Sequence, residues 1–177
     1  MELTFAPRGI LQIDDARICF RNFSGEGSMY NNEGNRNFSL VIPSEDIAEQ
    51  LRNDVNEYGA GWNVKIRAPR EEGDEAFIHM PVKVKYTDRS KPVIYVIINE
   101  GTRNEKRITL TEETVSMLDD ISIERVDMDI RPYDGEGRFG PHRTAYLQSM
   151  CVYQKNDLDR FTARFADEED EEDYMED

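Results

Sequence analysis

The chain has 177 residues and a formal net charge of −15, from 37 Asp and Glu against 22 Lys and Arg. This length suits one domain with a core of its own. The longest apolar run, residues 93–98, is far too short to span a membrane, and the N-terminus lacks the basic-then-apolar order of a signal peptide. The sequence therefore argues against a membrane protein and predicts a cytoplasmic one.

In chain order, alternating apolar residues first predict a long strand over residues 10–23, with room for a bulge or bend, and another over residues 36–42. Between them, residues 22–36 are rich in Gly and Asn and form a loop long enough to bind a ligand. Ser44 is a suitable N-cap for a helix over residues 44–58, in which apolar residues recur every fourth position.

The second half of the chain alternates in the same way. Thr111 is expected to cap a short helix over residues 112–118, and a connection rich in Gly and Pro, residues 131–143, joins the last two strands. The strands are expected over residues 62–68, 76–86, 92–99, 107–110, 121–130 and 144–154.

The negative charge is concentrated at the end of the chain. Residues 167–177 carry nine carboxylates and no base, which leaves a net charge of −6 on residues 1–166. Such a run repels itself and has no apolar face to bury. We expect a folded domain over residues 1–166 and a disordered acidic tail over residues 167–177, serving either as a solubility device or as a competitor for a basic groove.

These elements predict a mostly β fold, in which an OB-fold-like small barrel carries long loops and two short helices. A β-sandwich remains the alternative, because the strand period fits both architectures. Cys19 and Cys151 each fall in an apolar strand and lack CxxC spacing, so we expect free thiols.

Residues typical of catalysis are not found at their characteristic spacings. His79 and His142 are the only histidines, and neither has a partner at metal-ligand spacing. The sequence has no phosphate-binding loop and no nucleophile motif, so we expect neither enzyme activity nor a cofactor. Asp127 and Asp129 alternate along one strand and leave a metal-dependent nuclease open as a low-ranked alternative.

Positive charge gathers in one part of this acidic chain. Residues 60–110 hold ten Lys and Arg against seven Asp and Glu. Strand geometry sends Lys65 and Arg67 to one face of their strand, and Lys83 and Lys85 to one face of theirs. If the two strands are neighbours, the four side chains form a patch that suits a phosphate backbone.

Aromatic residues provide the second property of a surface for single strands, because bases stack on them. Those in polar or Gly-rich surroundings are the better candidates, and Tyr133 and Phe139 are interleaved with arginines that include Arg131. Phe23 and Tyr30 lie in the Gly-rich loop. We expect the aromatic residues in apolar strands to be core, namely Phe20, Phe38, Phe77, Tyr95 and Tyr146.

Five short segments stand out by their order and spacing: RNFSLVI at residues 36–42, GWNVK at 61–65, LTEETVSML at 110–118, IRPYD at 130–134 and TAYLQSM at 144–150. Together they resemble a family of bacteriophage single-stranded DNA-binding proteins, OB-fold replication proteins with acidic C-terminal tails, over roughly residues 10–155. Relatives often place a Trp and an Asn-Gly turn after the Arg-Pro-Tyr segment, whereas this chain continues with DGEGRF and its tail does not end in an aromatic residue.

The resemblance implies sequence-non-specific binding of single-stranded DNA in phage replication or recombination inside the bacterial host cell. The tail would compete for the groove and recruit replication proteins. Whether two copies of the chain form a homodimer is left open. A structural or interaction protein, such as a virion component or replication adaptor that binds no nucleic acid, is the alternative. The expected DNA-binding residues are Lys65, Arg67, Lys83, Lys85 and Arg131 for phosphates, and Tyr133, Phe139, Phe23 and Tyr30 for bases.

Overall fold

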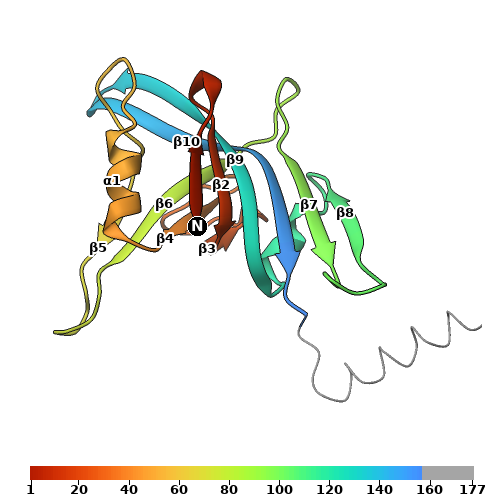
Figure 1. Ribbon diagram of the computed structural model, residues 1–177. Helices are drawn as coiled ribbons and strands as arrows, with labels where there is room; N and C mark the ends of the chain where they lie inside the picture. The colour runs from red at the N-terminus through yellow and green to blue at the C-terminus, as the bar shows by residue number, and fades with distance from the viewer. Residues whose placement is uncertain (157–177) are drawn as a thin grey trace, which may run out of the picture.

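A computed structural model describes residues 1–156 of the chain (Figure 1). This part is mostly β, as predicted, and the expected tail lies outside it. The strands are β1 Glu2–Phe5, β2 Leu11–Ala16, β3 Ile18–Asn22, β4 Arg36–Ile42, β5 Lys65–Arg67, β6 Phe77–Val84, β7 Val93–Ile98, β8 Lys106–Leu110, β9 Ile123–Gly137 and β10 Gly140–Gln154. The helix α1 is Glu45–Asn53, and two 3-10 turns, η1 and η2, are Pro7–Gly9 and Val115–Asp119.

The strands form one curved sheet with the order β1-β2-β9-β10-β6-β4-β3 (Figure 1). β5 pairs with β6, and the β7–β8 hairpin joins through β7. β10 is the central strand, because it pairs antiparallel with β9 along one edge and in parallel with β6 and then β7 along the other. Within residues 1–156 the sheet is not closed, so the expectation of a small closed barrel is only partly met.

The predicted strand over residues 10–23 is bent into β2 and β3. β2 pairs with β9 and β3 with β4, so one stretch of chain serves two distant parts of the sheet. Asp15 and Phe20 have positive φ values of 53° and 50°, each where the pairing register shifts. Bulges of this kind bend a strand and increase its twist, which explains the curvature.

The core lies on the inner side of the curved sheet, where alternate residues of the strands meet. β6 contributes Met80 and Val82, and β4 contributes Phe38 and Leu40, all of them at most 1% exposed. α1 packs Leu51 against the same core. The alternation that predicted the strands also predicts this inner face.

The predicted helix over residues 44–58 is confirmed, although it ends earlier. The Ser44 hydroxyl accepts a hydrogen bond from the Ile47 N–H at 3.3 Å, as an N-cap should. The helix ends at Asn53 because the Asn56 side chain accepts two backbone N–H groups of the following turn. Within residues 1–156, no helix is long and apolar enough to cross a membrane.

The second predicted helix, over residues 112–118, is wrong. The chain forms instead the 3-10 turn Val115–Asp119. Arg21 of β3 donates to the carbonyl oxygens of Leu118 and Ile121 at 2.7 and 2.6 Å. These bonds satisfy the carbonyls where the turn ends, so no further helical turn is needed to do so.

The predicted connection over residues 131–143 is also wrong, because β9 and β10 continue through it to a tip at residues 138–139. Its glycines belong to the ladder. A Cβ at Gly135 would lie 2.9 Å from the imidazole of His142, so glycine lets this ring lie over the neighbouring strand.

Arg143 ties the β9–β10 hairpin to the segment after α1. Arg143 is only 7% exposed. Its guanidinium donates to the Asp134 carboxylate at 2.9 Å and to the Asp54 carbonyl at 2.9 Å, and lies 5.2 Å from the centre of the Trp62 ring. Burial acts to raise the pKa of Asp134, but the hydrogen bonds from Arg143 and Asn56 outweigh it and lower that pKa. The charged pair therefore favours the folded state.

Candidate nucleic-acid interface

β6 has two chemically different sides. Met80 is fully buried on the inner side, whereas the alternate residues reach the solvent. We call the solvent side, with His79 and Lys83 of β6, Tyr146 of β10 and Arg131 of β9, the outer face. Pairing sets Tyr146 directly between Lys83 and Arg131. Residues from distant parts of the sequence therefore meet on this face.

The two cation-bearing strands are neighbours, as the predicted patch requires. β5 pairs with β6 so that Lys65 lies opposite His79 and Arg67 opposite Phe77. Lys83 lies four residues further along β6, about 13 Å away at the usual rise per residue. The cations therefore share one face but form two groups.

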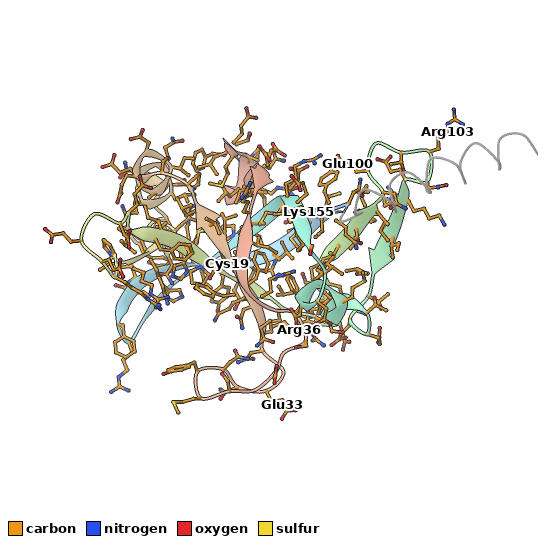
Figure 2. All side chains as sticks on the ribbon, turned by 90° about the horizontal axis from the view of Figure 1, so that it is seen from below. Cys19, Glu33, Arg36, Glu100, Arg103 and Lys155 are labelled. Carbon is orange, nitrogen blue, oxygen red and sulfur yellow. The ribbon has the colours of Figure 1, made fainter. Side chains whose placement is uncertain are left out.

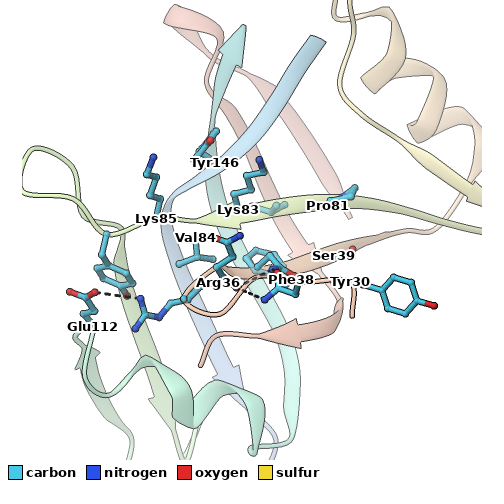
Figure 3. A pocket seen from close by; sticks show the side chains of 16 residues that line it. Tyr30, Arg36, Phe38, Ser39, Pro81, Lys83, Val84, Lys85, Glu112 and Tyr146 are labelled. Atoms are coloured by element: carbon cyan, nitrogen blue, oxygen red, sulfur yellow. Dashed lines mark hydrogen bonds and ion pairs between the residues drawn. The ribbon is translucent and has the colours of Figure 1, made fainter. Parts of the chain in front are cut away.

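A groove of about 700 Å³ lies between the end of β6 and the loop of residues 23–35 (Figure 3). The loop projects from the body of the molecule, with Glu33 near its outer end (Figure 2). Lys83, Lys85 and Tyr146 line the groove, and Tyr30 at its rim is 93% exposed. The structure thus brings three predicted binding residues, Lys83, Lys85 and Tyr30, to one groove.

The groove continues into a row of cations and rings across β6, β10 and β9. The Lys83 Nζ atom lies 5.9 Å from the centre of the Tyr146 ring, and the Arg131 guanidinium lies 5.0 Å from it. Tyr133 meets Tyr146 edge-on at 5.9 Å. Tyr146 was predicted to be core, but its ring is only partly buried and belongs to the row. The alternation of Ala145, Tyr146 and Leu147, in which the two smaller residues point inward, was the signal that could have identified it.

The β9–β10 hairpin carries two of the predicted stacking residues. Tyr133 is 58% exposed and stacks on His142 at 6.2 Å. Phe139 at the tip is 98% exposed, and the Arg138 guanidinium lies 5.9 Å from its ring. An apolar ring with almost its whole surface in water has little role in folding and is free to meet a ligand.

Phe23 corrects one predicted site residue, because its ring is fully buried. It stacks on Phe38 at 5.2 Å, and its backbone N–H donates to the Asp119 carboxylate at 2.8 Å. Its Gly-rich surroundings suggested a loop surface, but the chain anchors this ring in the core at the start of that loop. No base can stack on it.

A second aromatic group lies at the β5 end of the outer face. Phe20, predicted to be core, is 56% exposed and meets the rings of Phe77 and His79 at 5.9 and 5.5 Å. His79 also bonds to the Ser39 hydroxyl at 3.1 Å. Burial, then Lys65 and Arg67, lower the pKa of His79, so the imidazole is held neutral beside these cations.

The other half of the outer face is acidic. Asp127 and Asp129 follow the same side of β9 as Arg131, and Asp14 lies close to them. Burial and the Asp14 charge raise the pKa of Asp129. Among residues 1–156, no three His, Cys, Asp or Glu side chains are placed to hold a metal ion. A polyanion on this face would therefore be repelled from the Asp127 end and held at the β6 end.

Three solved structures of similar fold come from bacteriophage Enc34. The single-stranded DNA-binding protein from bacteriophage Enc34 in complex with ssDNA aligns with a TM-score of 0.55 at 14% identity, over 88% of this chain and 92% of that one. The same phage protein without DNA aligns with a TM-score of 0.51 at 14% identity, over 93% of this chain and 99% of that one. Its C-terminal truncation aligns with a TM-score of 0.51 at 13% identity, over 89% of this chain and 92% of that one. At these identities the likeness establishes the fold.

The family comparison covers almost the whole sequence. No curated protein matches the chain. The family model described as a putative phage ssDNA-binding domain matches residues 3–175. The chain therefore belongs to this family of phage single-stranded DNA-binding domains.

Proposed function

We propose that this protein binds single-stranded DNA along its outer face, without sequence preference, in phage replication or recombination. The observation that carries the proposal is the row Lys83, Tyr146, Arg131 and Tyr133, in which cations alternate with rings. Sequence-tolerant binding of single strands needs such a combination of a positive track and stacking surfaces. The family supports the ligand, and the Enc34 protein of similar fold was solved with ssDNA.

The proposed contacts follow the two halves of a nucleotide. Phosphates lie along the cations, and bases stack on exposed rings, to which Tyr146 is added and from which Phe23 is removed. The phosphate contacts are Lys65, Arg67, Lys83, Lys85 and Arg131, and the stacking residues are Tyr30, Tyr133, Phe139 and Tyr146.

We propose that the curved sheet is an opened OB barrel within a binding domain of residues 1–166. The bend between β2 and β3 supports this, because one stretch of chain there pairs with both β9 and β4. The protein would act in the cytoplasm of the host, without catalysis or cofactor, as a monomer or a homodimer.

The acidic tail, residues 167–177, is proposed to compete with DNA and to recruit replication proteins. Nine tethered carboxylates are attracted by the same cations that attract phosphates. DNA that displaces the tail would leave it available to a partner.

Removing residues 167–177 is expected to increase the affinity for poly-dT about tenfold at low salt, because the competing charge is gone. The difference should shrink as salt is added, since screening weakens the tail and the DNA alike. Fluorescence anisotropy with labelled poly-dT at several salt concentrations measures both effects.

A tail of equal length with its nine carboxylates replaced by Asn and Gln is the matched control, and it should bind as tightly as the truncated protein. If the neutral tail binds as weakly as the natural one, charge competition is wrong. If neither variant binds poly-dT at low salt, the protein is an interaction protein and the proposed function fails.

His79 is expected to take up a proton when DNA binds. In the free protein burial, Lys65 and Arg67 lower its pKa. A phosphate beside these cations offsets their charge and raises that pKa, so affinity should increase as pH falls from about 7.5 to about 5.5, around the ordinary histidine pKa. Titrations of wild type and H79Q at constant salt measure this. An unchanged slope in H79Q would assign the proton elsewhere.

A further inference from the structure

We infer that Phe20, Phe77 and His79 form a second base-stacking site, separate from the groove beside Lys83. The inference rests on the proposed function and extends it to residues outside the proposed contacts. It assigns the cations of β5 to the same site, so that one nucleotide meets the rings with its base and Lys65 or Arg67 with its phosphate.

The backbone conformation at Phe20 indicates that the fold itself holds this ring on the surface. A φ of 50° is rare for a large side chain and costs free energy unless the surroundings impose it. It occurs where two residues of β3 bulge out between the pairs Cys19–Ser39 and Asn22–Asn37. Bulges re-aim side chains, and this one turns Phe20 outward and Arg21 toward the η2 turn.

The three rings form a platform with an open side. Phe77 and His79 stack on each other at 5.4 Å with 26° between their planes, and Phe20 stands nearly perpendicular to both. More than half of Phe20 remains in water. A base can therefore cover this ring, a contact of the kind that binds single strands without regard to sequence.

Charge is placed beside the platform as a nucleotide requires. Lys65 pairs with His79 and Arg67 with Phe77, and both cations are exposed. In the free protein the uncharged imidazole beside Lys65 adds no charge of its own, so the two cations are available to a phosphate. Among the described residues the charged, polar and aromatic groups that face His79 are these cations, the Ser39 hydroxyl and the two phenylalanines, and its partner on β4 is the uncharged Val41.

The platform lies on the path to the groove. From His79 the outer face of β6 continues through Pro81 to Lys83, with Ser39 of β4 paired to Pro81. Neither carries a charge, so they form a neutral floor between two cationic ends. A single-stranded DNA long enough to cross this floor would occupy both the platform and the groove, and a shorter DNA would occupy only one of these sites.

The test compares oligo-dT of increasing length on wild type and F20N by fluorescence anisotropy. Asparagine tolerates positive φ, so the variant removes the ring without disturbing the bulge. We expect F20N to bind the shortest oligomers like wild type and the longest about tenfold more weakly, the loss expected for one stacked base. F5N is the matched control, since Phe5 is 47% exposed on β1, and it should match wild type at every length.

The melting temperature of F20N should equal or exceed that of wild type, because its backbone strain is relieved. Equal affinities at all lengths would overturn the inference, and so would an equal loss at all lengths with a lower melting temperature, which indicates a structural role. If wild type itself binds no oligo-dT, the proposed function has failed, a result distinct from a failure of the platform alone.

Discussion

K83E/K85E is expected to bind poly-dT roughly 100-fold more weakly than wild type at low salt, because it replaces two proposed phosphate contacts with two repulsive charges. Each lost contact should reduce the slope of log K against log salt by about 0.7 for a single strand. Lys83 near the end of β6 and Lys85 just beyond it extend to the same side as Tyr146 in the groove (Figure 3), so both charges are expected to act on one stretch of DNA. Salt-dependent anisotropy titrations measure the affinity and the slope.

K106E/K155E is the matched control for charge. It changes the net charge by the same amount at two exposed lysines, one on β8 and one beyond β10. It should weaken binding far less, since screening removes the effect of distant charges at moderate salt. Equal losses in the two variants would show that overall charge, rather than the groove, determines binding.

R143L is expected to lower the free energy of unfolding by about 3 kcal/mol, because it leaves the partly buried Asp134 and Asp54 carboxylates without their cation. For a domain of this size the melting temperature should fall by roughly 6–12 °C. Denaturant and thermal unfolding at neutral pH measure the change.

The effect should depend on pH in one direction. Since the pKa of Asp134 is lowered in the folded protein, its stabilisation is fully present above the ordinary Asp pKa and is lost as pH falls through the folded value. The gap between R143L and wild type should therefore narrow in acid. R52L breaks the exposed pair with Glu45 at 3.6 Å and should cost less than about 1 kcal/mol. A similar loss in both variants would contradict the role given to Arg143.

Local patterns in the sequence predict the elements wherever one periodicity dominates. The alternation in β4 and β6 identifies strands and their inner sides, and Ser44 marks the start of α1. The prediction errors occur where a residue distant in sequence determines the local structure. Arg21 from β3 satisfies the end of η2, and the ring of His142 covers Gly135 in a stretch whose composition suggests a loop.

The candidate site is predictable in its residue types and less so in its exact members. The cations of β5 and β6 follow from alternation, and the row beside them depends on β10 lying between β6 and β9, a non-local pairing that no short window of sequence reveals. Phe20, expected in the core, is exposed because a bulge turns it outward, and Phe23, expected at the surface, is buried against Phe38.

The central position of β10 has a consequence for how the protein is made. The ribosome synthesises β10 after all the strands it joins, and Tyr146 pairs with Lys83, made 63 residues earlier. Until β10 emerges, β6, β7 and β9 have unpaired edges that invite aggregation, and parallel pairing over such a separation is slow to form. The row of cations and rings therefore assembles last, so a nascent chain that lacks β10 has Lys83 of β6 without the Tyr146 ring that lies beside it in the folded protein.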